Sequence, residues 1–365
     1  MRTRGTLRLA TRGSTLARRQ AALVGETLEE RRYEVELVTV ETTGDQVRDE
    51  LIHRLGKTGA FVRELDERVL EGDVDAAIHS MKDMPTEQPD ELVTAAVPER
   101  GQPTDALVTP AGDALADLPE GATVGTSSLR RRAQLLSERP DLEVEPLRGN
   151  VDTRVEKLLA PTLQRDHQKR IEAENERETN QEDDDRTAEE WFDDRSELEK
   201  AALGREVETE YDAIVLAEAG LERSGLARSV EYDRLPPTTF PPAPGQGALA
   251  VTARDGETAR EIQSAIDHPR SRVETTVERT VLAELGGGCI APIGIYAIVQ
   301  GEYVHTTVQV YDRDGQQSVI ASRDLPIETH ASAAREFADD LADRGAAELI
   351  EEARREAEPE EPEGK

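Results

Sequence analysis

Apolar positions in the first hundred residues alternate between the spacing of strands and the spacing of helices. The predicted strands are TLRLAT, VELVTVET and DAAIHS, and the predicted helices are STLARRQAALVGETLEERR and GAFVRELDERVLEG. Ser14 stands where the first helix would be capped. Strands that alternate with helices in this order predict a parallel sheet covered by helices.

The same alternation starts again after PERGQPTDA, where proline and glycine interrupt both periods. Strands are predicted at TVGTS, LEVEPLRG and YDAIVLAEAG, and helices at SLRRRAQLLSER and VDTRVEKLL. The two starts, ATRGSTLARRQAAL and VGTSSLRRRAQLL, resemble each other, since each helix begins with hydroxyls, leucine and arginines. A helix N-terminus favours anions, so we predict two similar domains that face one cleft, although plain caps are the commoner role of such hydroxyls.

A third unit follows PPTTFPPAPGQGALAV, in which ALAV is a candidate strand of the first sheet. SRVETTVERTVLAEL predicts a helix, YAIVQGEYVHTTVQVYD antiparallel strands, and ASAAREFADDLADRGAAELI one final helix. The predicted fold class is α/β with three domains: two parallel or mixed sheets that flank a cleft, and a smaller α+β C-terminal domain with an antiparallel sheet. The expected boundaries are 1–98 with 247–264, 103–240, and 268–350, followed by an acidic disordered tail, 351–365.

Residues 160–208 are almost entirely polar and separate a predicted helix from the strand that should follow it closely. Only AEEWFDDRSELEKAAL has a helical stripe, through Trp191, Leu198 and Ala201. We expect a solvated acidic insertion with one weak helix. A docking arm or a lid remains the alternative.

The net negative charge of the chain limits the classes of ligand that it could bind. The chain has 77 acidic and 45 basic residues, a formal net charge of -32 and 3% aromatic residues, which argues against nucleic acid as a ligand. At about 1 M salt the Debye length falls to about 3 Å, so a salt-rich cytosol, as in a halophile, would screen this repulsion. An ordinary acidic protein is the alternative. A monomer is the simplest expectation.

The chain also lacks signs of a membrane or an oxidising compartment. It has no run of 18 apolar residues, and its first residues, MRTRGTLRLATRG, lack the apolar segment of a secretory signal. A single cysteine excludes an intramolecular disulfide. We therefore expect a cytoplasmic enzyme without a membrane partner.

Arginines gather near the ends of predicted strands, where open parallel sheets bind ligands. These are Arg12, Arg130, Arg131, Arg132, Arg148 and Arg154. Because guanidinium groups match carboxylates in a bidentate fork, the pattern predicts a polyanionic ligand, carboxylates in particular. Solvated helix arginines are the alternative, above all for Arg19 and for one of the three consecutive arginines, since one helix cannot aim all three at a cleft.

Two further segments contain candidate catalytic residues. In HSMKDMP, His79, Lys82 and Asp83 lie at or beyond the end of a strand, where a carboxylate could stabilise a cation or pass a proton; a surface ion pair is the alternative.

In ELGGGCIAPIG, the only cysteine, Cys289, follows three glycines, which permit unusual backbone angles and close approach of another group. Most free cysteines are buried apolar residues, but an accessible thiol here would suit nucleophilic attachment. Metal binding is not expected, because the histidines and the cysteine show no ligand spacing.

Several long motifs resemble the porphobilinogen deaminase family, also called hydroxymethylbilane synthases, and occur in the family's order. They are ATRGSTLA, FVRELDERVLEGDVDAAIHSMKDMP, GTSSLRRRAQL, LRGNVDTR, YDAIVLAEAGLERSGL, PGQGALAV and LGGGCIAPIG. The resemblance covers roughly residues 5–330 without the insertion. It implies three domains, the first two like periplasmic binding proteins.

The resemblance also implies a transferase of porphyrin and heme biosynthesis. The family joins four porphobilinogen molecules head to tail into linear hydroxymethylbilane and releases ammonia at each step. Its dipyrromethane cofactor is bound by a thioether to the cysteine that matches Cys289, and the carboxylate that matches Asp83 assists deamination. The arginines that would hold acetate and propionate groups match Arg12, Arg130, Arg131, Arg148, Arg154 and Arg223. Other positions on the cofactor side match Ser14, Lys82, Thr126 and Ser128. Arg132 is left out, because relatives often have a neutral residue there.

One departure from the family lies in GKTGAF, where Thr58 occupies the position of a usual loop lysine and Lys57 precedes it. Two other functions remain alternatives. One is a non-catalytic anion-binding protein on the same architecture, since fold does not fix function. The other is an inactive paralogue whose acidic arm is an interaction module.

Overall fold

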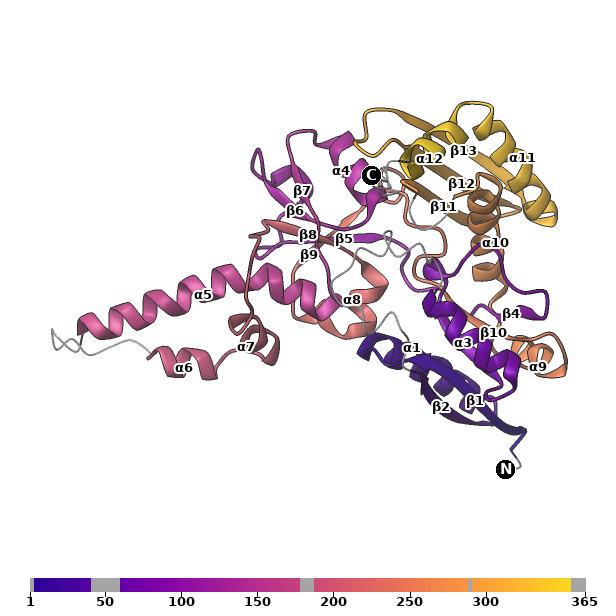
Figure 1. Ribbon diagram of the computed structural model, residues 1–365, viewed down its shortest axis with the longest axis horizontal. Helices are drawn as coiled ribbons and strands as arrows, with labels where there is room; N and C mark the ends of the chain where they lie inside the picture. The colour runs from indigo at the N-terminus through magenta and orange to yellow at the C-terminus, as the bar shows by residue number, and fades with distance from the viewer. Residues whose placement is uncertain (1–2, 41–59, 178–186, 288–290, 356–365) are drawn as a thin grey trace, which may run out of the picture.

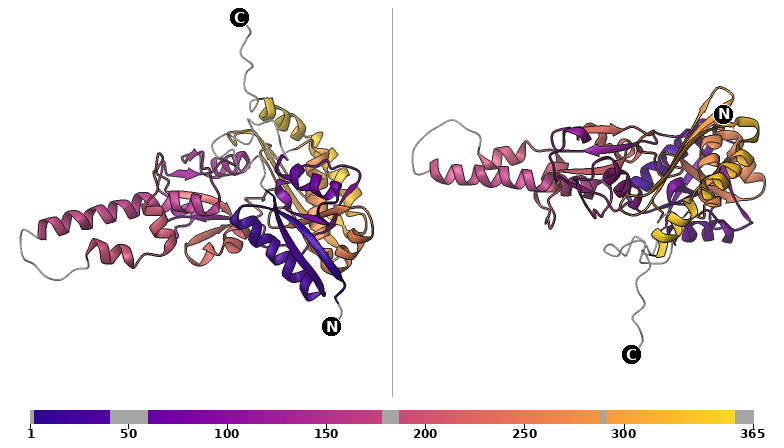
Figure 2. Two further views of the ribbon diagram at one scale, coloured as in Figure 1. Left: turned by 60° about the horizontal axis from the view of Figure 1, so that its bottom comes forward. Right: turned by 90° about the horizontal axis from the view of Figure 1, so that it is seen from above.

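The computed structural model describes residues 3–40, 60–177, 187–287 and 291–355. Three separate sheets organise these residues, and each sheet with its covering helices is called the first, second or third lobe in chain order. The lobes lie against one another, while a helical arm projects away from them (Figures 1 and 2).

The first lobe is a five-stranded sheet with the order β2-β1-β3-β10-β4. Its strands are β2 (Tyr33–Val40), β1 (Gly5–Arg12), β3 (Ala76–Ser80), β10 (Leu249–Arg254) and β4 (Leu92–Ala96). β1 pairs in parallel with β2 and β3, whereas β10 is antiparallel to β3 and β4. The apolar stripes of α1 (Thr15–Glu30) and α9 (Glu257–Ile266) pack on one core of the sheet, and α3 (Ala60–Glu71) packs on another. The sheet is mixed because the chain leaves after β4 and returns through β10.

The second lobe repeats this plan in the order β7-β6-β8-β5-β9. Its strands are β7 (Glu143–Glu145), β6 (Thr123–Gly125), β8 (Ala213–Ala217), β5 (Asp105–Val108) and β9 (Tyr232–Leu235). β6 is parallel to β7 and β8, and β5 is antiparallel to β8 and β9. α4 (Leu129–Glu138) packs on one core, and α8 (Glu218–Ser224) and the start of α5 (Val151–Arg177) pack on the other. The predicted pair of similar mixed α/β units is therefore confirmed.

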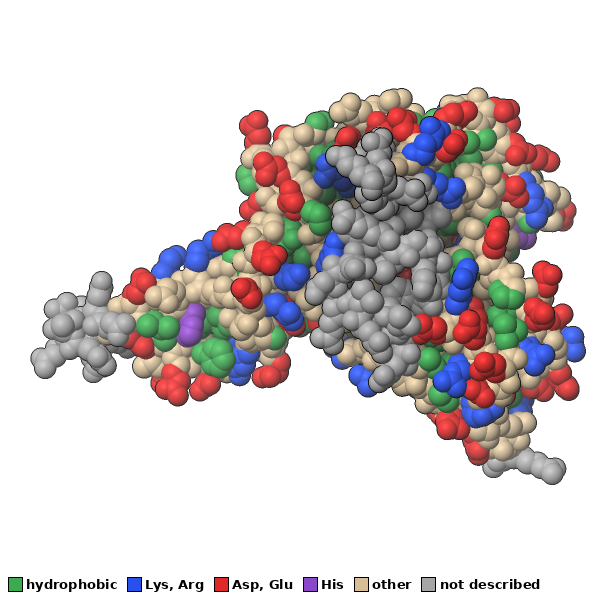
Figure 3. Space-filling model, in the orientation of Figure 1, with side chains coloured by type: hydrophobic (Ala, Val, Ile, Leu, Met, Phe, Trp, Pro, Cys, Tyr) green, Lys and Arg blue, Asp and Glu red, His purple; other side chains and the backbone are tan. Residues whose placement is uncertain are grey.

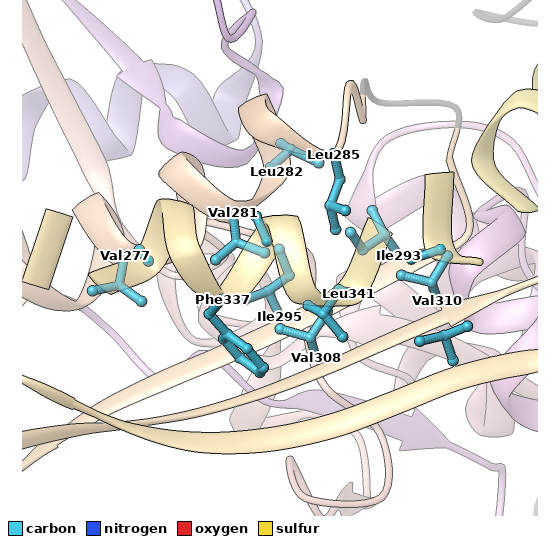
Figure 4. Close-up of a cluster of buried hydrophobic side chains, with 14 of the residues drawn as sticks. Val277, Val281, Leu282, Leu285, Ile293, Ile295, Val308, Val310, Phe337 and Leu341 are labelled. Carbon is cyan, nitrogen blue, oxygen red and sulfur yellow. The ribbon is translucent and has the colours of Figure 1, made fainter. Parts of the chain in front are cut away.

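The third lobe is an antiparallel meander of β11 (Ile293–Gln300), β12 (Tyr303–Tyr311) and β13 (Ser318–Pro326). It is covered by α10 (Pro269–Glu284), α11 (His330–Ala342) and α12 (Ala346–Arg355). Figure 4 shows its core, in which Val281 of α10 and Phe337 of α11 lie over Ile295 and Val308 of the sheet.

The end of the third lobe differs from the prediction in two ways. We expected one final helix, but two form, because Gly345 (φ 97°) leaves the helical conformation between α11 and α12. α12 also extends through Arg355 into the expected acidic tail, since Ala353 on its inner face is buried. The rest of that tail, 356–365, lies outside the described residues.

The arm contradicts the expectation of one weak helix. α5 continues to Arg177, and α6 (Ala188–Asp193) and α7 (Glu197–Leu203) lie along it (Figure 1). Two separate capping boxes, begun by Thr187 and Ser196, divide the expected helix into α6 and α7. The buried ring of Trp191 stacks on His167 of α5 at 5.7 Å between ring centroids, so an aromatic contact joins the two sides of an otherwise polar arm.

Acidic side chains are spread over the visible described surface of all parts of the molecule, with lysines and arginines scattered among them (Figure 3). This distribution follows the formal net charge of -32. Within the described ranges, no helix has the length and apolar character needed to cross a membrane.

Candidate active site

Lys82 and Asp83 lie in a short 3₁₀ helix, η2 (Met81–Asp83), which follows β3 directly. Met81 anchors this turn, because its side chain is buried and its backbone N–H donates to the carbonyl of Ala248 at 3.0 Å. Lys82 is half-buried and Asp83 is exposed. His79, a residue of β3, instead lies in the interior, where its Nε2 is 2.9 Å from Oδ1 of Asp66. The structure therefore separates His79 from the pair that the sequence placed beside it.

Charges from the second lobe reach Lys82. Its pKa is lowered, mainly by burial and further by the charge of Arg131, while Asp83 and Asp105 act in the opposite direction. Arg131 lies in α4 and Asp105 opens β5. The end of β3 in the first lobe thus faces charged groups of the second lobe.

Arg154 faces η2 from the first turn of α5. Its Nε donates to the carbonyl of Gly149 at 2.8 Å. Burial, with a further contribution from Arg131, lowers its pKa to about 10, while Asp83 acts in the opposite direction. Asp83 and Arg154 therefore lie within electrostatic reach of each other, although they belong to different lobes.

Arg130 and Arg131 converge on one buried carboxylate, that of Asp105. Nη2 of Arg130 lies 2.8 Å from Oδ2, and Nη2 of Arg131 lies 2.7 Å from Oδ1. Arg132 takes another direction, since its Nη1 donates to the carbonyl of Val144 at 2.7 Å. The prediction that the helix cannot aim all three arginines at one place is confirmed.

Three hydroxyls at the starts of α1 and α4 serve as caps or turns in this structure. Oγ of Ser14 accepts from the backbone N–H of Ala17 at 3.3 Å, and Oγ of Ser128 accepts from that of Arg131 at 3.4 Å. Oγ1 of Thr126 accepts from the N–H of Ser128 at 3.2 Å. These residues stand at equivalent places in the two lobes and shape the loops between strand and helix.

The remaining predicted arginines lie in three different places. Arg12 is the last residue of β1 and is half-buried. Arg148 lines a pocket of about 430 Å³ near the base of the arm, together with Lys157 and Tyr211. Nη2 of Arg223 donates to the carbonyl of Gly247 at 2.6 Å, so this side chain reaches the segment that returns from the second lobe to the first.

Cys289 lies outside the described residues, as do Lys57 and Thr58. On either side of the cysteine, Leu285 and Ile293 are buried in the third-lobe core (Figure 4). A Cβ at Gly287 would lie 2.5 Å from Cδ1 and 3.2 Å from the carbonyl oxygen of Leu282, so a larger residue there would require the Leu282 side chain to move. The role predicted for the glycines beside Cys289 stays a prediction, because the cysteine itself lies outside the described residues.

Asp105 and Gln246 were not among the predicted site residues. Nε2 of Gln246 donates to Oδ1 of Asp105 at 2.9 Å and to the carbonyl of Pro103 at 2.7 Å. One available signal was that an acidic residue opens the buried run DALV. Another was that Gln246 stands between two glycines in PGQGAL.

Six residues thus form what we call the interlobe cluster. They are Lys82, Asp83, Asp105, Arg130, Arg131 and Arg154. Four cations face two carboxylates, and Nε of Arg130 is buried without an acceptor among the described residues. Surplus positive charge and a vacant donor fit a ligand with several carboxylates. No group of three metal-ligating side chains occurs within the described ranges.

The chain is a two-lobed α/β protein to which a third lobe is attached, and a cluster rich in cations lies between the first two lobes. The chain belongs to the porphobilinogen deaminase family. Residues 7–166 and 196–261 match the family's dipyromethane cofactor binding domain, and residues 273–343 match its C-terminal domain. The unmatched residues between the two parts of the first domain, 167–195, include the end of α5 and the whole of α6 in the arm. The chain is accordingly a transferase of tetrapyrrole biosynthesis.

Individual relatives agree with this assignment. A probable porphobilinogen deaminase of Halobacterium salinarum is 53% identical over 391 aligned residues, which cover 96% of this chain and 99% of the relative. A porphobilinogen deaminase of Acidothermus cellulolyticus is 38% identical and covers 98% of this chain and 94% of its own length. Lipoprotein Tp32 of Treponema pallidum superposes with a TM-score of 0.35 at 14% identity, over 75% and 95% of the two chains.

Proposed function

We propose that the interlobe cluster is the site at which porphobilinogen units are joined into linear hydroxymethylbilane, and that Cys289 carries the dipyrromethane cofactor through a thioether. The observation that carries this proposal is the convergence of Asp83 and Arg131, from two different lobes, on the pKa values of both Lys82 and Arg154. It gathers an exposed carboxylate and several cations from segments far apart in the sequence.

The cations would bind the acetate and propionate groups of porphobilinogen. Arg131 lowers the pKa of Arg154, and both arginines lower the pKa of Lys82, as expected where positive charges are crowded. An anionic ligand would relieve the repulsion between these cations. The cations are already close together, so this relief would contribute to the free energy of binding. Arg12, Arg148 and Arg223 would contact carboxylates farther along the chain of pyrroles, and Ser14, Thr126 and Ser128 would shape the two helix starts.

Asp83 would act on the reacting unit. Loss of ammonia breaks a carbon–nitrogen bond and leaves positive charge on the substrate, and formation of the new carbon–carbon bond then releases a proton from a pyrrole carbon. An exposed carboxylate beside cations can stabilise that charge and accept that proton. Lys82 would hold a substrate carboxylate next to it, since both lie in η2.

The third lobe would present the thiol of Cys289. When bound, the dipyrromethane supplies the acceptor pyrrole to which the first substrate unit is joined. Leu285 and Ile293 anchor the segments before and after the thiol in one apolar core. Because the attachment point is four residues from each of them in the sequence, it would be tethered close to this core.

Intact mass spectrometry of the full-length protein, purified at high salt, tests this assignment. We expect a mass above that of the sequence by one dipyrromethane unit, and we expect Cys289→Ser to remove the excess and the turnover of porphobilinogen together. Wild-type protein without added mass that still forms tetrapyrrole would refute the thioether.

We further propose that the enzyme works in the cytoplasm as a monomer and that the three lobes correspond to the domains 1–98 with 247–264, 103–240 and 268–350. The net charge of -32 opposes self-association. Light scattering over a range of salt concentrations would show a single-chain mass, and a dimer mass at all of them would contradict this.

A further inference from the structure

Asp105 occupies a special position between the lobes. It is the first residue of β5 and directly follows the connection that enters the second lobe, and only 1% of its surface is exposed. The neighbouring cations hold the pKa of this carboxyl well below its usual range, so it is ionised at any pH at which the protein works.

The Asp105 carboxylate brings the side chains of two consecutive arginines together. Consecutive side chains leave a helix about 100° apart, so Arg130 and Arg131 have no intrinsic reason to lie together. Each binds a different carboxylate oxygen, at 2.8 Å and 2.7 Å, and Nη1 of Arg131 also donates to the carbonyl of Val215 at 2.9 Å. One buried anion therefore sets the positions of two guanidinium groups that would otherwise repel each other.

Asp105 is also tied to both segments that connect the first and second lobes. Gln246, on the returning segment, donates from Nε2 to Asp105 and to the carbonyl of Pro103 on the outgoing segment. The carbonyl of Gln246 accepts from Nε of Arg100 at 2.8 Å, and Arg100 forms a bidentate pair with Glu278 of the third lobe at 2.9 Å. A continuous chain of buried polar contacts thus runs from the third lobe to the arginine pair.

We propose that Asp105 is a positioning residue for ligand binding: it fixes Arg130 and Arg131 in the arrangement that receives the carboxylates of cofactor and substrate, and Gln246 orients it. This rests on the proposed function of the arginines. Because Asp105 acts through other side chains and not on the reacting atoms, its loss affects binding more than the chemical step.

The test compares three variants of the full-length protein. Asp105→Asn keeps the shape and removes the charge, and it places an amide N–H against one of the two guanidinium groups. Asp105→Glu keeps the charge. Glu218→Gln is the matched control, because Glu218 is also a fully buried carboxylate of the second lobe, paired with Arg234, and Asp105 pairs in register with the preceding residue, Ala217.

Each variant is measured for the fraction of protein with the cofactor mass, for KM and kcat of the loaded fraction, and for thermal unfolding. We expect Asp105→Asn to lower the loaded fraction and raise KM by about tenfold or more, the effect of losing one charge-assisted hydrogen bond, with a smaller change in kcat. Asp105→Glu should restore loading and KM at least in part. Glu218→Gln should lower the unfolding temperature and leave loading and KM unchanged.

Several results would overturn the inference: wild-type loading and KM in Asp105→Asn, no recovery in Asp105→Glu, or an equal rise of KM in Glu218→Gln. If Asp105→Asn does not fold, Gln246→Met decides, because it keeps the volume and removes the donor to Asp105; an unchanged KM in that variant would refute the role. Wild-type protein with neither cofactor mass nor turnover would refute the proposed function instead.

Discussion

Asp83 of the first lobe counteracts the fall in the pKa of Arg154 of the second lobe, which burial lowers to about 10. The two side chains are carried by η2 and α5, so neither sheet alone contains the site. Lys82 shares this environment, since Asp83 and Arg154 both act on its pKa. A change in the distance between the lobes would therefore change the binding and the reacting groups at the same time.

Asp83→Asn should lower kcat by about 10²–10⁴-fold, the range for removal of a general acid or base, because an amide neither accepts the proton nor balances positive charge. KM should change much less, since Lys82 and the arginines remain. Glu87→Gln is the control, because Glu87 is an exposed carboxylate close in sequence. Steady-state kinetics of ammonia release measures both variants. Undiminished kcat in Asp83→Asn would remove this residue from the mechanism.

Lys82 should make stability depend on alkaline pH. Burial lowers its pKa in the folded protein from the ordinary value of 10.5, so between the lowered value and 10.5 the folded protein holds fewer protons than the unfolded chain. The free energy of unfolding that this group contributes therefore rises with pH across that window. Lys82→Met should flatten the rise, as measured by denaturant unfolding at a series of pH values. Lys169→Met, at a side chain that is 74% exposed, should keep the wild-type slope; equal slopes in all three proteins would contradict the prediction.

The sequence predicted the parts of the site that depend on local structure. Ser14 and Ser128 cap helices as the repeated pattern indicated, and Lys82 and Asp83 follow a strand as expected. The long motifs, such as GTSSLRRRAQL and LGGGCIAPIG, indicated the family without any knowledge of contacts between the lobes. Helix geometry also indicated that one of the consecutive arginines had to turn away.

The sequence could not show which arginine turns away, because Asp105 decides this through a contact between the start of β5 and α4. It also did not indicate Gln246, whose role depends on the return of the chain beside Pro103.

The prediction of one weak helix in the arm was wrong for a different reason. Its helices depend on capping boxes and on the contact between Trp191 and His167, whereas hydrophobic periodicity detects only helices with an apolar stripe.

The arm should unfold before the rest of the molecule. Trp191 is the only tryptophan of the chain, so its fluorescence reports on the arm alone. The buried side chains of α6 and α7 are few, namely Ala188, Trp191 and Ala202, and weakly packed segments open at lower free energy. In a denaturant titration, the fluorescence change should precede the loss of far-ultraviolet circular dichroism. Coincident transitions would show that the arm and the lobes form one cooperative unit.

Removal of the arm should spare catalysis. The family profile omits residues 167–195, and their ring contacts are made within the arm. Replacing them with a short Gly–Ser linker should leave the cofactor mass intact and kcat within about twofold of wild type, as expected for an exposed projection. Intact mass and kinetics measure this. Loss of either property would assign the arm to the site.

Gly247 should be far less replaceable than another glycine with the same backbone conformation. Gly247 (φ +82°) and Gly72 (φ +80°) both adopt the left-handed region, but a Cβ at Gly247 would lie 2.6 Å from the carbonyl oxygen of Gly101, whereas a Cβ at Gly72 meets nothing within 4 Å among the described residues. Gly72→Ala should therefore cost only the conformational penalty of about 1–2 kcal/mol.

Gly247→Ala adds a collision between the two segments that connect the lobes, so it should cost more than about 3 kcal/mol. It should also raise KM, because the carbonyl of Gly247 accepts from Arg223 and the N–H of Gly101, and displacement of that carbonyl shifts the lobes relative to each other. Urea unfolding and steady-state kinetics measure the two effects. If both alanine variants lose equal stability and keep the wild-type KM, the connection tolerates displacement and does not set the distance between Asp83 and Arg154.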